Sequence, residues 1–174
     1  KSKYLFGIND RYNKLRKDRG MEERKLNTKF FLIHTFSHLL INQLSYSCGY
    51  GSSSLRERIF CNLEHKDKNM NGVLIYTASG DSEGSLGGLV REGEPKNIIK
   101  IIEQAINKSR VCSYDPVCFE HKSQGLNGTN ASACHACSFL PETSCEEANQ
   151  LLDRTTIIGD SKNNLKGYFD DLII

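Results

Sequence analysis

The sequence lacks the features that would place it in a membrane or on an export pathway. None of its apolar runs reaches the roughly 18 residues typical of a membrane-spanning helix. The first residues, KSKYLFGIND, are polar and basic and contain no apolar core of a signal peptide. The chain begins with Lys rather than Met, so we expect it to be a fragment of a larger protein. We therefore expect a cytoplasmic location and no contact with a membrane.

Familiar catalytic motifs are also missing. The glycine-rich loop at 81–89 is not followed by Gly-Lys-Ser/Thr, so it is not a P-loop, and no Walker motif occurs elsewhere. His34 and His38 are four residues apart, but Thr35 stands where a zincin has Glu. We expect no ATP hydrolysis by this segment.

The composition is that of one globular domain. The chain has 174 residues, of which 38% are hydrophobic and 25% charged, enough to bury a core. Its net charge of +2 is too small to imply nucleic-acid binding by itself. Seven cysteines would leave one thiol over in a disulfide framework. A reducing compartment and a bound metal are therefore the favoured explanation of the cysteines.

Five of the seven cysteines lie in a loop at 112–145, and their spacing indicates a structural zinc site. The loop contains one C-x-x-C pair and a second pair directly after a predicted helix. The four predicted ligands are Cys112, Cys118, Cys134 and Cys137. Cys145 is the reserve ligand, and His121 and His135 are weaker candidates. A site with four thiolates is closed, so it supports structure and leaves no position for an activated water.

Hydrophobic periodicity predicts a mixed α/β fold, with a long buried helix packed on a small central sheet and a cysteine-rich zinc-binding loop. The long helix covers 27–46, with Asn27 or Thr28 as its cap and Gly49 near its end. A second helix is expected from Ser52 or Ser53 to about 63, with a Ser54-x-x-Glu57 capping box. A buried strand at 72–79 and a helix at 95–110 follow.

The remainder of the chain after the zinc loop has weaker patterns. We expect a helix at 145–153 and a short strand at 155–158. The tail after residue 161 either adds an edge strand or docks elsewhere on the fold. The apolar face predicted for the helix at 95–110 comprises Ile98, Ile99, Ile102, Ala105 and Ile106.

A group of polar residues has two interpretations. His34 and His38 project from one helix face, and in one arrangement of the fold Glu57, Arg56, Asp81 and Glu83 would converge with them. The favoured interpretation is a structural one, with core histidines and a salt-bridged network tying helices to the strand. The alternative is a nuclease-like or hydrolytic active site that uses His34, His38, Glu57, Asp81 and Glu83.

The segment 11–29 is rich in basic residues. A solvated helix or linker face is the favoured explanation of such a run. The functional alternative is contact with a nucleic-acid backbone, where each Lys or Arg displaces a counterion. The candidate DNA contacts are Arg11, Lys14, Arg16, Lys17 and Arg91. We accordingly divide the chain into a basic lead-in, 1–29, and a zinc-binding domain, 30–174.

Several stretches, taken together, resemble the MZB (MrfA-type zinc-binding) domain family. They are HTFSHLLINQL, GYGSSSLRERIF, GVLIYTASGDSEGSLGGLVREGEP, CSYDPVC, ACHACSFLPETSCE and NQLLDRTTII, in this order over roughly residues 30–158. The family occurs at the end of MrfA-type repair helicases and in the DrmB subunit of the DISARM phage-defence system. The five-cysteine arrangement with PETSCE is more similar to the DrmB branch. The four-cysteine cluster of the helicase branch matches Cys112, Cys118, Cys134 and Cys137 here, and Cys145 has no counterpart there.

The resemblance implies an accessory domain rather than an independent catalyst. Its implied cofactor is a structural Zn²⁺, and its implied partners are a superfamily 2 helicase and DNA. The expected role is to support DNA binding, translocation or subunit assembly in an anti-phage or DNA-repair complex. Two rivals stay open: the hydrolytic domain described above, and a pure protein–protein scaffold.

Overall fold

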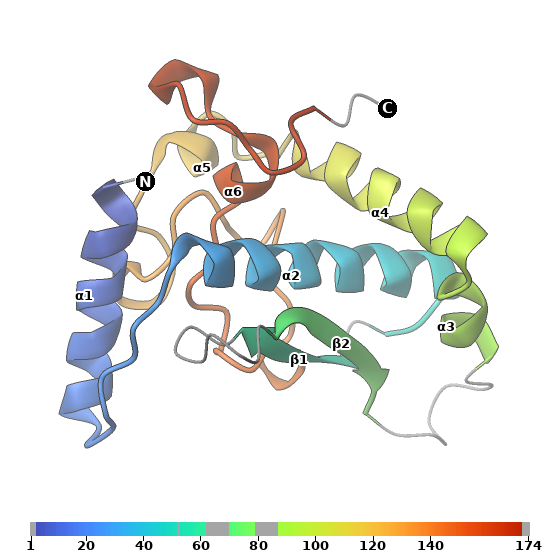
Figure 1. The fold of residues 1–174 in the computed structure, drawn as a ribbon, viewed down its shortest axis with the longest axis horizontal. Coiled ribbons are helices and arrows are strands. Elements are labelled where there is room, and N and C mark those ends of the chain that lie inside the picture. The colour runs from blue at the N-terminus through green and yellow to red at the C-terminus, as the bar shows by residue number, and fades with distance from the viewer. Residues whose placement is uncertain (1–2, 52, 62–69, 79–86, 172–174) are drawn as a thin grey trace.

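The computed structural model describes residues 3–51, 53–61, 70–78 and 87–171 (Figure 1). It has the predicted mixed class, with several helices and a small antiparallel sheet. The helices are α1 (Lys3–Asp18), α2 (Thr28–Cys48), α3 (Gly87–Glu92), α4 (Pro95–Ser109), α5 (Val117–Glu120) and α6 (Thr155–Ile158). The 3-10 turns are η1 (Leu126–Gly128), η2 (Glu142–Ser144) and η3 (Ser161–Asn163), and the strands are β1 (Leu55–Cys61) and β2 (Asn71–Thr77). No helix in the described part of the chain combines the length and apolarity needed to span a membrane.

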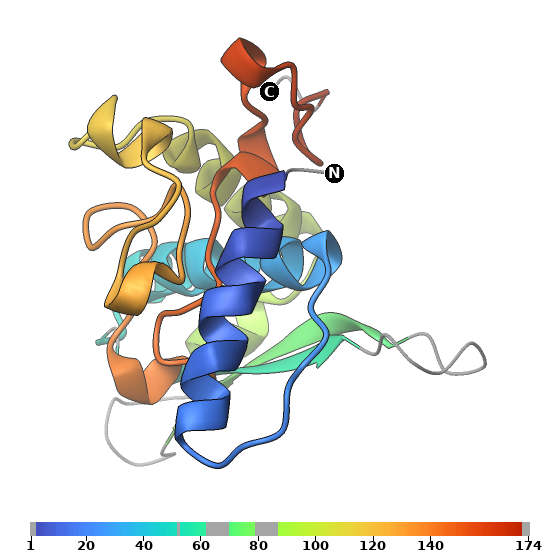
Figure 2. The ribbon, with the colours of Figure 1, turned by 90° about the vertical axis from the view of Figure 1, so that its left-hand side faces the viewer.

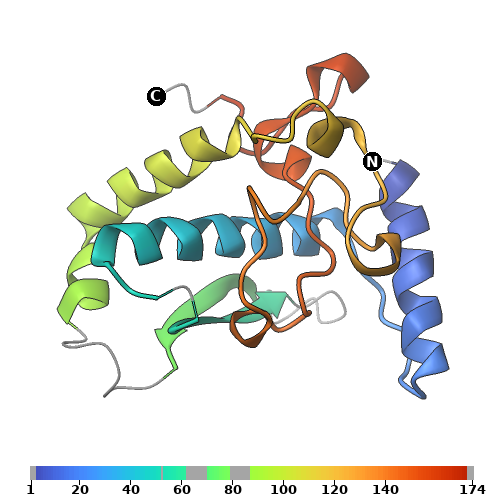
Figure 3. The same cartoon turned by 180° about the vertical axis from the view of Figure 1, so that it is seen from behind.

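Helix α2 lies in the middle of the molecule. The β hairpin runs along one side of it and α4 along the other, while the cysteine-rich segment crosses its back (Figures 1 and 3). Its start is capped by the Asn27 side chain, which accepts a hydrogen bond from the Phe30 amide. Gly49 ends the helix with φ 73°, a left-handed value that glycine adopts without strain. Both ends agree with the sequence prediction.

Different faces of α2 pack on different neighbours. Near its start, Phe30 and Phe31 pack with Ile8 of α1 and with Ala131 and Leu151. Farther along, Ile41 and Leu44 meet the hairpin and α4. Because neighbours pack on several of its faces, α2 is buried around most of its circumference and positions the other elements.

The hairpin corrects the prediction of a second helix. Residues 55–61 form β1, which pairs with β2 in an antiparallel register that sets Glu57 opposite Ile75. Leu55 and Glu57 are buried against α2, and Arg56 between them is exposed. This alternation is that of a half-buried strand, and it outweighs the apparent Ser54-x-x-Glu57 capping box. Strand β2 is where it was predicted, but it is only partly buried.

Helices α4 and α1 cover two further sides. Helix α4 has the predicted bounds, and its buried residues are Ile101, Ala105, Ile106 and Ser109. Ile99, predicted on the buried face, is 57% exposed, because the face that contacts α2 is turned towards Ile101. Helix α1 packs Leu5, Ile8 and Tyr12 into the core beside the start of α2 (Figure 2).

The region after the zinc loop differs from the prediction. Residues 145–153 form turns rather than a helix, because Ala148, Asn149 and Leu151 all have positive φ, which an α-helix cannot contain. Residues 155–158 form helix α6 and not a strand. The Asp153 carboxylate accepts a hydrogen bond from the amide of Thr155, the first residue of this helical turn, at 3.0 Å.

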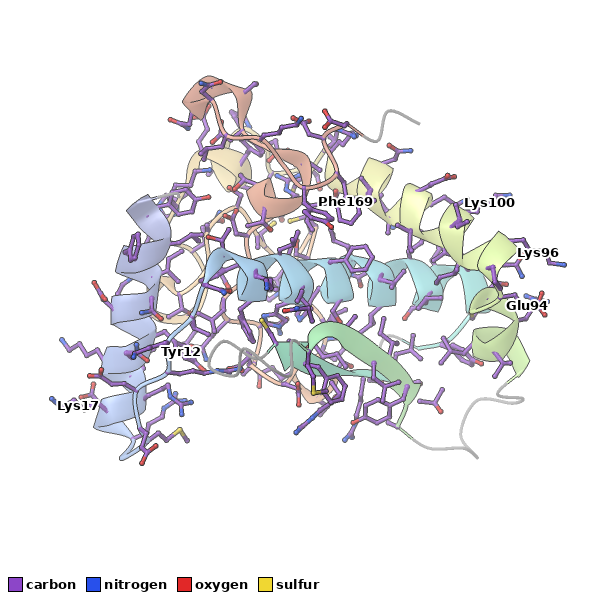
Figure 4. All side chains as sticks on the ribbon, in the orientation of Figure 1. Tyr12, Lys17, Glu94, Lys96, Lys100 and Phe169 are labelled. Atoms are coloured by element: carbon purple, nitrogen blue, oxygen red, sulfur yellow. The ribbon has the colours of Figure 1, made fainter. Side chains whose placement is uncertain are left out.

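The tail docks on the helices. Phe169 stacks on Phe36 of α2 with ring centroids 5.5 Å apart (Figure 4). Gly159 and Gly167 pass so closely that a Cβ on Gly167 would lie 2.2 Å from the Gly159 nitrogen. Within 159–171 the chain makes a single β-bridge, Asp160 with Leu165, so the tail adds no edge strand to the hairpin.

Candidate metal centres

Four cysteine side chains gather at one place behind α2. Their sulfur atoms all lie within 4.8 Å of one another, and we call them the tetrathiol cluster: Cys112, Cys118, Cys134 and Cys137. Cys112 follows the end of α4 and Cys118 lies in α5. Cys134 and Cys137 come from one tight turn, in which the Cys134 carbonyl accepts hydrogen bonds from the Cys137 and Ser138 amides. The structure therefore brings together the four residues that the spacing predicted.

The spacing of the sulfur atoms fits a tetrahedral metal site. The Sγ–Sγ distances are 3.5 Å for Cys112–Cys134, 3.8 Å for Cys118–Cys137 and 3.7 Å for Cys134–Cys137. Four sulfurs around a zinc ion with Zn–S bonds near 2.3 Å would be separated by about 3.8 Å. The described cysteines form no disulfide, so every thiol in the cluster is available as a ligand.

Hydrogen-bond donors point at two of these sulfurs. The Tyr114 amide donates to the Cys112 sulfur at 3.4 Å, and the Ser138 hydroxyl donates to the Cys137 sulfur at 3.3 Å. Such donors stabilise a thiolate relative to a thiol. A metal-bound cysteine is a thiolate, so the surroundings suit a ligand.

The cysteine pKa values show how strongly the four sulfurs are crowded. Burial raises the pKa of Cys112 to about 11, and the hydrogen bond with Cys137 raises the pKa of Cys118. The pKa of Cys137 is lowered, first by the hydrogen bond from Cys118. Four thiolate charges at these Sγ–Sγ distances cannot all form unless a cation lies among them.

A buried arginine braces the cluster. Arg154 has no exposed surface, and it donates to the Asp115 carboxylate at 2.7 Å and to the Ser109 carbonyl at 3.0 Å. Asp115 in turn accepts a hydrogen bond from the Cys112 amide. The positive charge of Arg154 also lies near the Cys118 sulfur, at 3.9 Å. Neither Arg154 nor Asp115 was a sequence candidate, because nothing in the local pattern links residue 154 to the loop.

A cavity of about 490 Å³ opens beside the tetrathiol cluster. Cys112 and Cys137 form part of its wall, together with His135 and with Tyr46 of α2. His135 is exposed there and is not among the grouped ligand atoms, and neither is the exposed His121. One edge of the cluster thus faces a hollow of the surface.

A second group of ligand-type side chains lies on the hairpin side of α2. Its four ligand atoms are also within 4.8 Å of one another, and we call it the histidine cluster: His34, His38, Glu57 and Cys145. His34 and His38 are one turn apart on α2, Glu57 is on β1, and Cys145 directly follows η2. Glu57 meets the two histidines here, which is one of the arrangements considered from the sequence, whereas Cys145 lies in this cluster and not in the tetrathiol cluster.

The side chains of the histidine cluster are in direct contact. The His34 Nε2 atom is 3.2 Å from the Cys145 sulfur and 3.1 Å from the Glu57 Oε1 atom. The His38 Nε2 atom is 3.5 Å from the same Glu57 oxygen. The His and Glu side chains have no exposed surface, so water has no direct access to them.

The charges of these groups are strongly coupled. Burial lowers the pKa of His34, but its hydrogen bonds with Cys145 and Glu57 outweigh burial and raise it to about 10. Burial raises the pKa of Cys145, but the two histidines outweigh it and lower the value to about 7. Burial likewise raises the pKa of Glu57, and the two neighbouring histidines, His34 before His38, lower it further than burial raises it.

The other predicted members of this polar group are not in it. Arg56 is exposed on the opposite face of β1 from Glu57, because neighbouring residues of a strand point to opposite sides. Asp81 and Glu83 lie outside the described residues. The hydrolytic alternative therefore retains only its buried members among the residues that the structure describes.

The candidate DNA contacts have different surroundings. Arg11 donates to the Gly128 carbonyl at 2.9 Å, and Arg16 donates to the Glu22 carbonyl at 2.7 Å. Arg91 of α3 is exposed and pairs with Glu92 at 3.0 Å. Lys14 and Lys17 are exposed on α1. These two lysines are thus the candidates best placed to meet an external partner.

Comparison with known proteins places these findings in context. The family model for the MrfA Zn-binding domain (MZB) matches residues 36–138, a segment that includes the whole tetrathiol cluster. The DISARM protein DrmB of Bacillus paralicheniformis is 43% identical over 144 residues, which is 83% of this chain. The chain spans only 25% of the length of that protein. Both findings agree with the resemblance found in the sequence motifs.

Proposed function

Because the chain belongs to the MrfA Zn-binding domain family, we propose that it is the zinc-binding accessory domain of a phage-defence complex related to DISARM. The observation that carries the zinc assignment is the tetrathiol cluster, with four sulfurs at tetrahedral spacing inside the matched segment. Zinc held by Cys112, Cys118, Cys134 and Cys137 would supply structure, since four protein ligands fill a tetrahedral site.

The proposed zinc site holds in place the long, mostly irregular segment between α4 and α6. Between α4 and α6 the described elements are only short turns, so few backbone hydrogen bonds of regular structure hold this segment. The four cysteines tie its first half to the end of α4, and Arg154 ties its end to the same place. The domain then presents a defined surface to its partners.

The proposed partners are a superfamily 2 helicase and DNA. DrmB is a DISARM protein by name, and 43% identity supports a similar assignment for this chain. The segment has no Walker motif, so the proposed role is to assist a motor carried elsewhere. Co-purification tests this proposal: the tagged protein, expressed beside the neighbouring reading frames, is expected to retain a helicase subunit. A Cys134→Ser variant is expected to lose it.

DNA contact is proposed for the exposed face of the basic lead-in, 1–29. Lys14 and Lys17 of α1 would neutralise phosphates, which makes binding dependent on salt. The double variant Lys14→Ala/Lys17→Ala is expected to lower the slope of log affinity against log salt by about 1 per lysine. Lys100→Ala is a matched control, because Lys17 and Lys100 lie at opposite ends of the molecule (Figure 4).

Two outcomes would redirect the assignment. Helicase capture without any DNA affinity would leave a pure protein–protein scaffold. Cleavage of labelled DNA with Mg²⁺ or Mn²⁺, abolished by His38→Ala, would favour the hydrolytic alternative. The complete burial of His34, His38 and Glu57 argues against that alternative, because a substrate phosphate would have to reach them.

A further inference from the structure

The histidine cluster has the composition and geometry of a second metal site, separate from the tetrathiol cluster. We propose that His34, His38, Glu57 and Cys145 bind a second Zn²⁺ ion, which joins α2, β1 and the segment after η2. The family match does not assign this site: it covers 36–138, so His34 and Cys145 lie outside it.

The distances are those of atoms arranged around a common centre. Zinc bonds of about 2.0–2.3 Å to nitrogen, oxygen and sulfur place neighbouring ligand atoms roughly 3.3–3.8 Å apart. The contacts of the cluster are 3.1, 3.2 and 3.5 Å, and all four ligand atoms lie within 4.8 Å of one another. Only small side-chain shifts are needed to surround an ion.

The hydrogen bonding of His38 presents the correct nitrogen. Its Nδ1 atom is 2.8 Å from the Ser138 carbonyl, which can only accept, so Nδ1 carries the proton. The Nε2 atom then has a free lone pair directed at the cluster. Metal-binding histidines are usually fixed in this way by a carbonyl or carboxylate on the other ring nitrogen.

The Cys145 sulfur is surrounded as a metal-bound thiolate is. It accepts hydrogen bonds from two backbone amides, those of Glu147 at 3.4 Å and Asn149 at 3.2 Å. These amides converge on it because the chain turns sharply at Ala148 and Asn149, both with positive φ. The turn that replaced the predicted helix thus serves to hold the sulfur.

Buried polar atoms of the cluster are left without hydrogen bonds. The His34 Nδ1, His38 Nε2 and Glu57 Oε2 atoms have no hydrogen-bond partner, although all three are fully buried. Buried polar atoms are normally satisfied, and an exception calls for an ion or another explanation. An ion at the centre of the cluster would accept the lone pair of His38 Nε2. It would also give Glu57 Oε2 a partner, since both oxygens of that carboxylate can then face the ion.

The mixed ligand set selects zinc among common metals. Imidazole and thiolate together suit zinc, whereas magnesium and calcium require oxygen ligands. Four protein ligands in a site without water access make a closed, structural centre. The proposed ion would therefore hold the hairpin and the loop against α2 rather than activate a water molecule.

Zinc content measured by elemental analysis tests the proposal. The purified protein is expected to contain about two zinc ions per chain, and Glu57→Gln and Cys145→Ser are each expected to lose about one. The matched controls His121→Ala and Cys48→Ser lie outside both clusters and are expected to lose none. Unchanged zinc in Cys145→Ser would overturn the proposal.

X-ray absorption at the zinc edge of the unaltered protein provides a test that needs no variant. With both sites filled, nitrogen or oxygen ligands accompany sulfur, and the mean number of sulfurs per zinc falls below the four of the tetrathiol cluster. A spectrum with sulfur ligands alone, at one zinc per chain, would overturn the proposal. It would leave the tetrathiol assignment intact, so the two assignments fail separately.

Discussion

The tetrathiol cluster and the histidine cluster are assembled from very different distances along the chain. The tetrathiol ligands all come from 112–137, a segment with only short turns of regular structure. The histidine cluster joins a helix, a strand and a turn, and its His34–Cys145 contact spans 111 positions of the sequence. One cluster belongs to a loop, and the other belongs to the packed core.

This difference has an energetic consequence. A loop with little regular structure relies on its ligand bonds, so metal binding and local folding are nearly one event. The elements that carry His34, His38 and Glu57 also pack through apolar side chains such as Phe31, Ile41 and Leu55. We therefore expect the loop to depend more on its metal than the core does.

Loss of a tetrathiol ligand is expected to have the largest effect. Structural zinc contributes roughly 10–16 kcal/mol of binding free energy in small zinc domains, so Cys137→Ser should unfold at least the segment 112–153. Hydrogen exchange would show this as loss of amide protection in that segment, which includes α5. Cys61→Ser, outside both clusters, is the control. Protection in Cys137→Ser equal to that of the control would remove the dependence of the loop on its metal.

Glu57→Gln is expected to destabilise the core by about 3–5 kcal/mol, the range for removal of one partner from a buried ion pair. The substitution preserves volume but removes the charge that faces His34 and His38. Urea unfolding would measure the change, and the exposed Glu23→Gln serves as control. A change below about 1 kcal/mol would mean that the histidine cluster is as weakly coupled to stability as a surface pair.

The same contrast explains how much of each cluster could be predicted from sequence. The C-x-x-C and the pair before it are local patterns, so all four tetrathiol cysteines were predicted. The histidine pair was also visible, one turn apart on a predicted helix. The position of Cys145 was not, because turns at Ala148 and Asn149 replace the helix expected there, and their backbone angles leave little trace in the sequence.

The elements of the fold were also predictable where a local sequence pattern marks them, and not where distant segments decide the structure. Helices α2 and α4 and strand β2 have clear periodicity or caps, and they were predicted. Strand β1 was taken for a helix because a Ser-x-x-Glu pattern, Ser54 to Glu57, overlaps its start, and only its pairing with β2 decides the outcome. Arg154 and Asp115 meet across 39 positions of the sequence, so no local pattern could have joined them.

Arg154→Met is expected to affect the tetrathiol cluster and not the histidine cluster, so it distinguishes the two. Arg154 is fully buried and compensates the negative charge of a zinc ion with four thiolates, so we expect a loss of about 2–3 kcal/mol. Zinc affinity of the tetrathiol cluster should fall about 10–100-fold, with no change at the histidine cluster. Competition with a chelator would measure both. Arg58→Met, which removes an exposed pair with Glu146, should cost under about 1 kcal/mol.

Asp160→Asn provides the smallest effect, and it tests whether acid sensitivity belongs to the metal clusters alone. Burial raises the pKa of Asp160, but hydrogen bonds from Asn163 and Lys122 outweigh it, so the folded pKa lies below the usual 3.8. A lowered folded pKa adds stability above the unfolded pKa, and this stability is lost as pH falls through the folded pKa. At neutral pH the variant should be less stable by about 1 kcal/mol, with Lys122 3.3 Å from the carboxylate. Acid also releases zinc, but from parent and variant alike, so the difference between their urea midpoints isolates Asp160. That difference should shrink as the pH is lowered below 3.8, through the lowered folded pKa. A constant difference would show that the stabilisation comes from packing rather than charge.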